Sequence, residues 1–265
     1  MLCPESREIE WNSRERQCVI CLRILFANMT NLLRVAVPVL IPCLLLITAC
    51  QFDGTPEGPT RDTAIHIDRG SAERANVDLN MAAGEMILRG GAAKLVEGRF
   101  EFNVPSWEPK VDSSNNGSQT TIKISQPENA HLGGHRHYLW DLQLNDQVLL
   151  DLNINCGAGQ AKLTLGDLDL HNVEVHMGAG QVELDLRGKP TRDYQVEVSG
   201  GVGQATVHLP ENVGIWAEAH GGLGSITVTG LDKKDNHWEN SLYDKGKVNV
   251  RLKVEGGIGE IRIIS

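Results

Sequence analysis

The chain has 265 residues, of which 41% are hydrophobic, 5% aromatic and 22% charged, and 28 are glycine. This composition excludes a disordered chain, a collagen and a membrane protein with several spanning helices. The net charge of −9 argues against electrostatic binding of nucleic acid or anionic lipid, because phosphate binding needs clustered Lys and Arg side chains.

Residues 1–49 have the pattern of an export signal. From Met29, the sequence MTNLLR leads into 14 uncharged residues, VAVPVLIPCLLLIT, a run too short to span a bilayer, which takes about 20 residues. Residues 1–28 mix acidic and basic side chains, which is unusual at the start of a signal, so we expect translation to begin at Met29. The segment ends in Ile47, Thr48, Ala49 and Cys50, which resembles the lipobox of bacterial lipoproteins.

This resemblance implies that the Cys50 thiol receives a diacylglyceryl group and becomes the first residue of the mature chain. An ordinary signal peptide followed by a chance cysteine is the alternative. Because the protein is acidic, its acyl chains would have to hold it on the membrane. We therefore expect an exported, membrane-anchored lipoprotein. With Gln51 rather than Asp after the cysteine, the outer membrane is favoured if the organism has two membranes.

Residues 50–63 contain Gly and Pro without apolar periodicity and predict a tether. From residue 64 onward the dominant pattern is strict alternation, as in Val77, Leu79 and Met81, which is typical of β-strands. We expect an N-terminal β domain over residues 64–130 and a regular β-repeat domain over residues 138–265.

An internal repeat supports this organisation. Six segments align on a single glycine in each, and apolar residues occupy the same positions around it. These glycines are Gly84, Gly159, Gly180, Gly203, Gly224 and Gly259. The spacing of 21 to 23 residues between the middle members predicts stacked short strands, either a β-solenoid or a rolled sheet, with a glycine-enabled bend in each repeat.

Three repeat columns give packing predictions. In the column three residues before the repeat glycine, the first three repeats have Met81, Cys156 and Met177, and the last three have glycine. In the column one residue before it, the first three repeats have alanine, and the last three have the larger Val202, Leu223 and Ile258. We interpret both columns as interior positions of conserved volume, with Cys156 a buried, unreactive thiol. The residues just after the glycine, including Gln160, Gln181 and Gln204, are expected to form a ladder of aligned amides along the stack.

The segment GGAAKLVEGRFEFNVPSWEPKV, with TTIKISQ after it, carries a family resemblance. Its marked residues are Gly90, Leu95, Gly98, Phe100, Trp107, Pro109 and Val111. Together with the glycine repeats, they resemble the bacterial toast-rack domain family, and the C-terminal part is similar to the β-rich ends of cell-wall-active-antibiotic response proteins. The resemblance covers about residues 64–265 and implies a rack of stacked strands with no established catalytic activity. A lipobox and tether stand here where the membrane-regulator relatives have transmembrane helices.

Motifs for cofactors and catalysis are not found. The glycine repeats lack the third glycine of a dinucleotide fingerprint and the Lys of a phosphate loop, and apolar residues replace the aspartate of calcium-binding nonapeptide repeats. HExxH, GxSxG and SxxK elements are also absent. We therefore expect no cofactor and no catalytic residue.

Two further segments contain candidate binding residues. His131, His135 and His137 in HLGGHRH are weak candidates for a Zn²⁺ or Cu²⁺ site, against the alternative of a solvated loop. Trp238 and Tyr243 in LDKKDNHWENSLYDKGK are candidate partner contacts, although Trp238 could instead fold back to cover the last repeat.

The sequence thus predicts a non-enzymatic, lipid-anchored protein of the cell envelope. It would act as an interaction or envelope-stress sensing scaffold, with an envelope protein or glycan as partner. Two alternatives remain open: a carbohydrate-active β-helix enzyme and a metal-binding periplasmic module.

Overall fold

The computed structural model describes residues 58–127 and 137–265. These residues form thirteen strands in one mixed sheet, together with a single turn of 3-10 helix at Pro105–Trp107. The strands are β1 (Arg61–Ile67), β2 (Arg74–Arg89), β3 (Val96–Phe102), β4 (Lys110–Asn116), β5 (Gln119–Ser125), β6 (Tyr138–Leu144), β7 (Leu149–Thr164), β8 (Leu170–Asp185), β9 (Tyr194–His208), β10 (Gly214–Thr229), β11 (Asp232–Lys234), β12 (His237–Glu239) and β13 (Asn249–Ile264).

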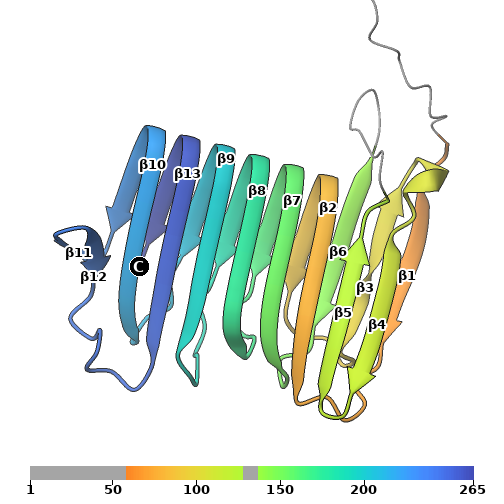
Figure 1. The fold of residues 1–265 in the computed structure, drawn as a ribbon, viewed down its shortest axis with the longest axis horizontal. Coiled ribbons are helices and arrows are strands. Elements are labelled where there is room, and N and C mark those ends of the chain that lie inside the picture. The colour runs from red at the N-terminus through yellow and green to blue at the C-terminus, as the bar shows by residue number, and fades with distance from the viewer. Residues whose placement is uncertain (1–57, 128–136) are drawn as a thin grey trace, which may run out of the picture. The chain divides into compact units, whose positions relative to one another are not determined.

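Six long strands, each of 15 or 16 residues, form the body of this sheet. Each strand rises, bends over and descends, so that the strands stand as a row of parallel arches (Figure 1). Every neighbouring pair is parallel, and the repeat glycines lie opposite one another, as with Gly159 opposite Gly180 and Gly180 opposite Gly203. The glycine alignment read from the sequence is therefore the strand register of the fold.

The order of the arches differs from the order of the chain. The path runs β2-β7-β8-β9-β13-β10, so the last repeat in sequence, β13, is inserted between β9 and β10. Strand β10 is thus the last arch in space, although β13 is the last in sequence. The repeat glycines of these two strands, Gly224 and Gly259, are 35 residues apart, and the longer connection allows this change of order. We call the part of each long strand before its bend the first leg and the part after it the second leg. The short strand β12 pairs with the first leg of β10 through Trp216 and Ala217.

The core fills the space between the two legs of the arches. Alternate residues of most legs are buried, such as Leu150, Leu152 and Ile154 on the first leg of β7 and Leu163 on its second, whereas the second leg of β10 is largely exposed. The alternation seen in the sequence therefore separates an inner apolar face from an outer polar one.

At the β2 end, separate strands replace the arch: β5 pairs with the first leg of β2 and β6 with its second leg. Aromatic rings in edge-to-face contact fill the core here, including the Phe100–Trp140 pair, whose centroids are 5.4 Å apart, and the Trp107–Tyr138 pair at 5.7 Å. The Tyr138 hydroxyl donates a hydrogen bond to the Trp107 carbonyl oxygen at 2.9 Å. These residues lie in and beside the segment that carried the family resemblance.

The all-β prediction is confirmed, and the repeats form a rolled sheet that does not close on itself. The sheet continues from the first predicted β segment into the second through β2, which pairs with β7 over its whole length. Among the described residues, no helix is long and apolar enough to cross a membrane.

Candidate functional site

The crests of the arches are built largely of glycine. The repeat glycines have positive φ angles between 128° and 148°, a region that L side chains rarely adopt. Neighbouring crests also approach closely, since a Cβ atom on Gly159 would lie 1.9 Å from the Gly84 carbonyl oxygen. The bend therefore needs glycine both for its backbone conformation and for the spacing of the stack.

Beneath the crests, the interior is filled from both legs. On β8 the space is occupied by Met177, but on β9, β13 and β10 the equivalent residues are Gly200, Gly256 and Gly221. The facing leg compensates at two of these arches: a Cβ atom on Gly256 would be 3.1 Å from Ile261 Cδ1, and one on Gly221 would be 3.4 Å from Ile226 Cδ1. In these two arches, an isoleucine on the second leg therefore fills the space that a glycine leaves on the first leg.

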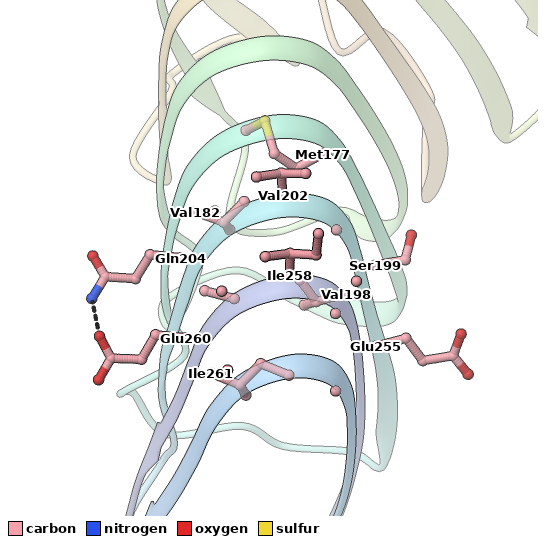
Figure 2. Close-up of a pocket in the computed structure, with 18 of the residues that line it drawn as sticks. Met177, Val182, Val198, Ser199, Val202, Gln204, Glu255, Ile258, Glu260 and Ile261 are labelled. Carbon is pink, nitrogen blue, oxygen red and sulfur yellow. Dashed lines mark hydrogen bonds between the residues drawn. The ribbon is translucent and has the colours of Figure 1, made fainter. Parts of the chain in front are cut away.

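On β9 this compensation fails, because Gly200 and the facing Ala205 are both small. A Cβ atom on Gly200 would have its nearest neighbour 3.8 Å away. A hollow of about 80 Å³ results, and Met177, Val182, Val198 and Ile261 are among the residues that line it (Figure 2).

The residues before the repeat glycines correct one sequence prediction. Val202, Ile258 and Leu223, which we call the crest row, are not interior: they are 53%, 53% and 70% exposed. They lie opposite one another on the paired strands β9, β13 and β10 and form a continuous apolar row. Glycines flank each of them in the GGxG pattern, so there are few side chains beside them to cover them. The GGxG pattern is therefore the signal in the sequence that these three residues are exposed.

Polar residues border the crest on both sides. Ser199 and Glu255 point outward from the first legs, and Gln204 and Glu260 from the second legs (Figure 2). The six positions of the predicted ladder lie in register from Glu85 to Ser225, but the described residues show no hydrogen bond between Gln160, Gln181 and Gln204. Within it, Gln204 Nε2 donates a hydrogen bond to Glu260 Oε2 at 3.2 Å. The crest row is thus an apolar line with a polar border, as in many protein-binding surfaces.

A stack of planar groups lies on the outer face near the base of β10. His237 stacks on Trp216 with ring centroids 5.3 Å apart, and the Arg251 guanidinium lies 5.5 Å from the Trp216 ring. Arg251 also donates two hydrogen bonds to the Tyr243 hydroxyl, at 3.0 and 2.7 Å. Tyr243, a predicted partner contact, is therefore held within the fold by this stack.

Trp238, the other predicted partner contact, is half-buried and packs against the core. It lies opposite the buried Ala217 where β12 meets the first leg of β10, and the Lys233 ammonium is 5.6 Å from its ring. Trp238 therefore folds back onto the arch that ends the row, β10, rather than onto the last repeat in sequence, β13, and it reaches only the first leg of β10.

The predicted lipid and metal residues fall mostly outside the described residues. Cys50, His131 and His135 lie outside the described residues, so their roles stay predictions. His137 is described: it is exposed, and its Nε2 lies 3.5 Å from Glu101 Oε2. Within residues 58–127 and 137–265 no cluster of three metal-binding side chains occurs.

Several titratable groups have shifted pKa values, and each shift has a local structural cause. Burial raises the pKa of the Cys156 thiol to about 12, which agrees with the predicted unreactive core cysteine. Burial also raises the pKa values of the Tyr138 and Tyr194 hydroxyls above their usual range. A hydrogen bond from the Arg187 side chain lowers the pKa of the Asp185 carboxyl on the outer face. The same contact raises the pKa of Arg187. Tyr138, Cys156, Asp185 and Tyr194 belong to four different strands, and within the described part of the chain no common cleft is lined by all of them.

One hydroxyl–imidazole pair resembles part of a catalytic arrangement. The His176 Nδ1 and Ser199 Oγ atoms are 2.6 Å apart on neighbouring strands. Both side chains belong to the outer polar row beside the crest, where Asn155 and Glu255 continue the row. A nucleophile needs an oxyanion-binding pocket as well as a base, and this pair lies on an open sheet face.

Comparison with known proteins gives one family match. Residues 56–208 match the family described as the N-terminal domain of toast_rack, DUF2154. No curated protein shows significant similarity to the chain.

Solved structures give further matches. A Clostridium sporogenes protein named "putative cell adhesion protein" is 28% identical, with a TM-score of 0.75, over 77% of this chain and 98% of its own. A Bacteroides fragilis protein named "putative adhesin" is 9% identical over 79% of this chain and 99% of its own, with a TM-score of 0.29. The first match is to a protein with a similar fold along nearly its whole length.

Proposed function

Because the chain belongs to the toast-rack family, we propose that it is a non-enzymatic protein of the cell envelope whose rigid rack of arches presents a contact surface to a partner. The chain would be anchored by lipid at Cys50, and the tether over residues 50–63 would hold the rack away from the bilayer.

The observation that carries this proposal is the crest row. Three large aliphatic side chains, Val202, Ile258 and Leu223, are more than half exposed on adjacent strands. Isolated exposed apolar residues are common on soluble proteins, but a contiguous row with a polar border is typical of an interaction site. The rigid sheet below it would lower the entropic cost of binding, because the row is already in place.

The comparisons support a contact role. The solved structure that is 28% identical carries the name "putative cell adhesion protein", which agrees with binding rather than catalysis. The described residues add physical support, since the shifted pKa values have local causes and the Ser199–His176 pair lies on an open face. Of the candidate functions, a contact scaffold therefore fits the geometry best.

The test is site-specific photo-cross-linking in cells that express the full chain. A photoreactive residue at Leu223, on the crest, is expected to give light-dependent adducts. The matched control is Lys162, which is exposed on the outer face of β7 in the same sheet. Adducts from Leu223, Val202 and Ile258 but not from Lys162 would support the proposal. Membrane-associated protein that gives no adduct from any crest position would contradict it.

A further inference from the structure

The outer edge of β10 is open along its second leg. Strand β12 covers this edge only at Trp216 and Ala217, on the first leg. In the part of the chain that the structure describes, no strand pairs with the outer edge of residues 221–229. Residues 220–227 are all exposed. The backbone groups of this leg are therefore available to a further strand.

This edge also lacks the charges that usually protect a free strand. The other outer strands carry them: Arg61 and Asp62 on β1, and Lys110 and Asp112 on β4. By contrast, residues 223–231 read LGSITVTGL and contain no charged side chain. Natural proteins place charges on edge strands to prevent pairing, and this uncharged, β-prone edge lacks that protection.

The segment 223–231 is symmetric about its centre, Thr227. When it is aligned antiparallel with a second copy of itself, the residues at equal distances from the centre have the same character. The matched pairs are Leu223 with Leu231, Gly224 with Gly230, Ser225 with Thr229, and Ile226 with Val228. The two inner pairs lie within β10, which ends at Thr229, whereas Gly230 and Leu231 follow the strand. In the fold, Val228 packs against the core and Ile226 lines the hollow, so this pair shares the inner face of the sheet.

We infer that this edge is a self-association site, at which the second leg of β10 pairs antiparallel with the same leg of a second copy of the chain. Two identical edges that meet about a two-fold axis make the same contacts in both directions, and the register centred on Thr227 satisfies this symmetry. The pairing would cover Ile226, which is 39% exposed in the single chain, and would bring the second copy next to Leu223, which is 70% exposed. The inference deepens the proposed function, because Leu223 belongs to the crest row.

Charge variants at Thr227 test the register, because the two Thr227 side chains would lie directly opposite each other. We expect the purified full chain to be dimeric by sedimentation. Thr227→Glu and Thr227→Lys should each weaken self-association about tenfold or more, since like charges then face each other. An equimolar mixture of the two variants should restore the dimer, a result that misfolded variants could not give. Thr206→Glu, in the same row two strands inside the sheet, is the control and should leave the dimer unchanged.

A Thr227→Cys variant provides a second readout. Oxidation should join the two introduced thiols in a disulfide between chains, identified by mass spectrometry, because side chains directly opposite on antiparallel strands are close enough for this bond. Thr206→Cys should give no such bond. A monomeric full chain, or a dimer that the charge variants leave intact, would overturn the inference. In that case, cross-links from Leu223 to a different protein would still support the proposed function, so the two failures are distinguishable.

Discussion

A Cβ atom placed on Gly203 would lie 1.8 Å from the carbonyl oxygen of Gly180 in the neighbouring arch. No side chain fits this contact, and the φ angle of Gly203, 143°, is itself unfavourable for other residues. Three positions earlier on the same strand, Gly200 has a φ outside this region and room for a Cβ atom. These two glycines of one crest therefore have different physical roles.

Gly203→Ala is expected to destabilise the fold by about 3 kcal/mol or more, because the arch must move away from its neighbour. Gly200→Ala is the matched control. It should change stability by less than about 1 kcal/mol, since the methyl group enters the hollow. Urea unfolding of the full chain measures both. Equal losses for the two variants would contradict the difference in packing.

Trp238→Ala is expected to lower the free energy of unfolding by about 1–3 kcal/mol and the Tm by about 3–10 °C, because a large apolar contact with the core is removed. Leu242→Ala, at an exposed position in the same connection, should have little effect. Thermal unfolding followed by circular dichroism separates the two variants. Unchanged stability of Trp238→Ala with loss of partner binding would instead assign Trp238 to recognition.

The Cys156 thiol gives a pH-dependent prediction. Its pKa is raised by burial from 9.0 to about 12, so in the folded state it stays protonated where the unfolded chain ionises. The stability it contributes is therefore complete below pH 9 and declines as the pH rises from 9 towards 12. Buried Tyr138 and Tyr194 add a decline in the same direction. Cys156→Ala should show a shallower loss of stability between about pH 9 and 10, measured by urea titrations. An identical slope would refute this assignment.

Crest residues should contribute little to folding. Leu223→Ser is expected to change the unfolding free energy by less than about 0.5 kcal/mol, because the side chain is 70% exposed. Leu252→Ala, on the buried face of β13, should cost about 2–5 kcal/mol. A large loss for Leu223→Ser would mean that the crest row stabilises the arches rather than serving a partner.

Cys50→Ser is expected to abolish metabolic acyl labelling and membrane association, since the lipid would be attached to that thiol. Cys43→Ser, within the predicted signal, is the control and should remain labelled. Fractionation of cells and intact-mass measurement give the result. Labelling that continues in Cys50→Ser would show that the anchor lies elsewhere or is absent.

The sequence alone determined that the fold is all-β and which residues lie opposite one another in neighbouring arches. Alternating residues such as Leu150, Leu152 and Ile154 can have only one inner face, and the repeat glycines must align because only glycine accepts both the bend and the close approach. It also placed Cys156 in the core, because every member of its column had apolar neighbours at alternate positions.

Only the tertiary structure decided the order of the arches and the exposure of the crest row. All repeats share the same columns, so each could pair with any other, and the sequence carried no preference for placing β13 between β9 and β10. That placement leaves β10 at the end of the row of arches with Leu223 and Ile226 exposed. Whether Val202 is buried depends on the direction in which the crest faces, and three glycines around it leave that direction open until the legs have packed.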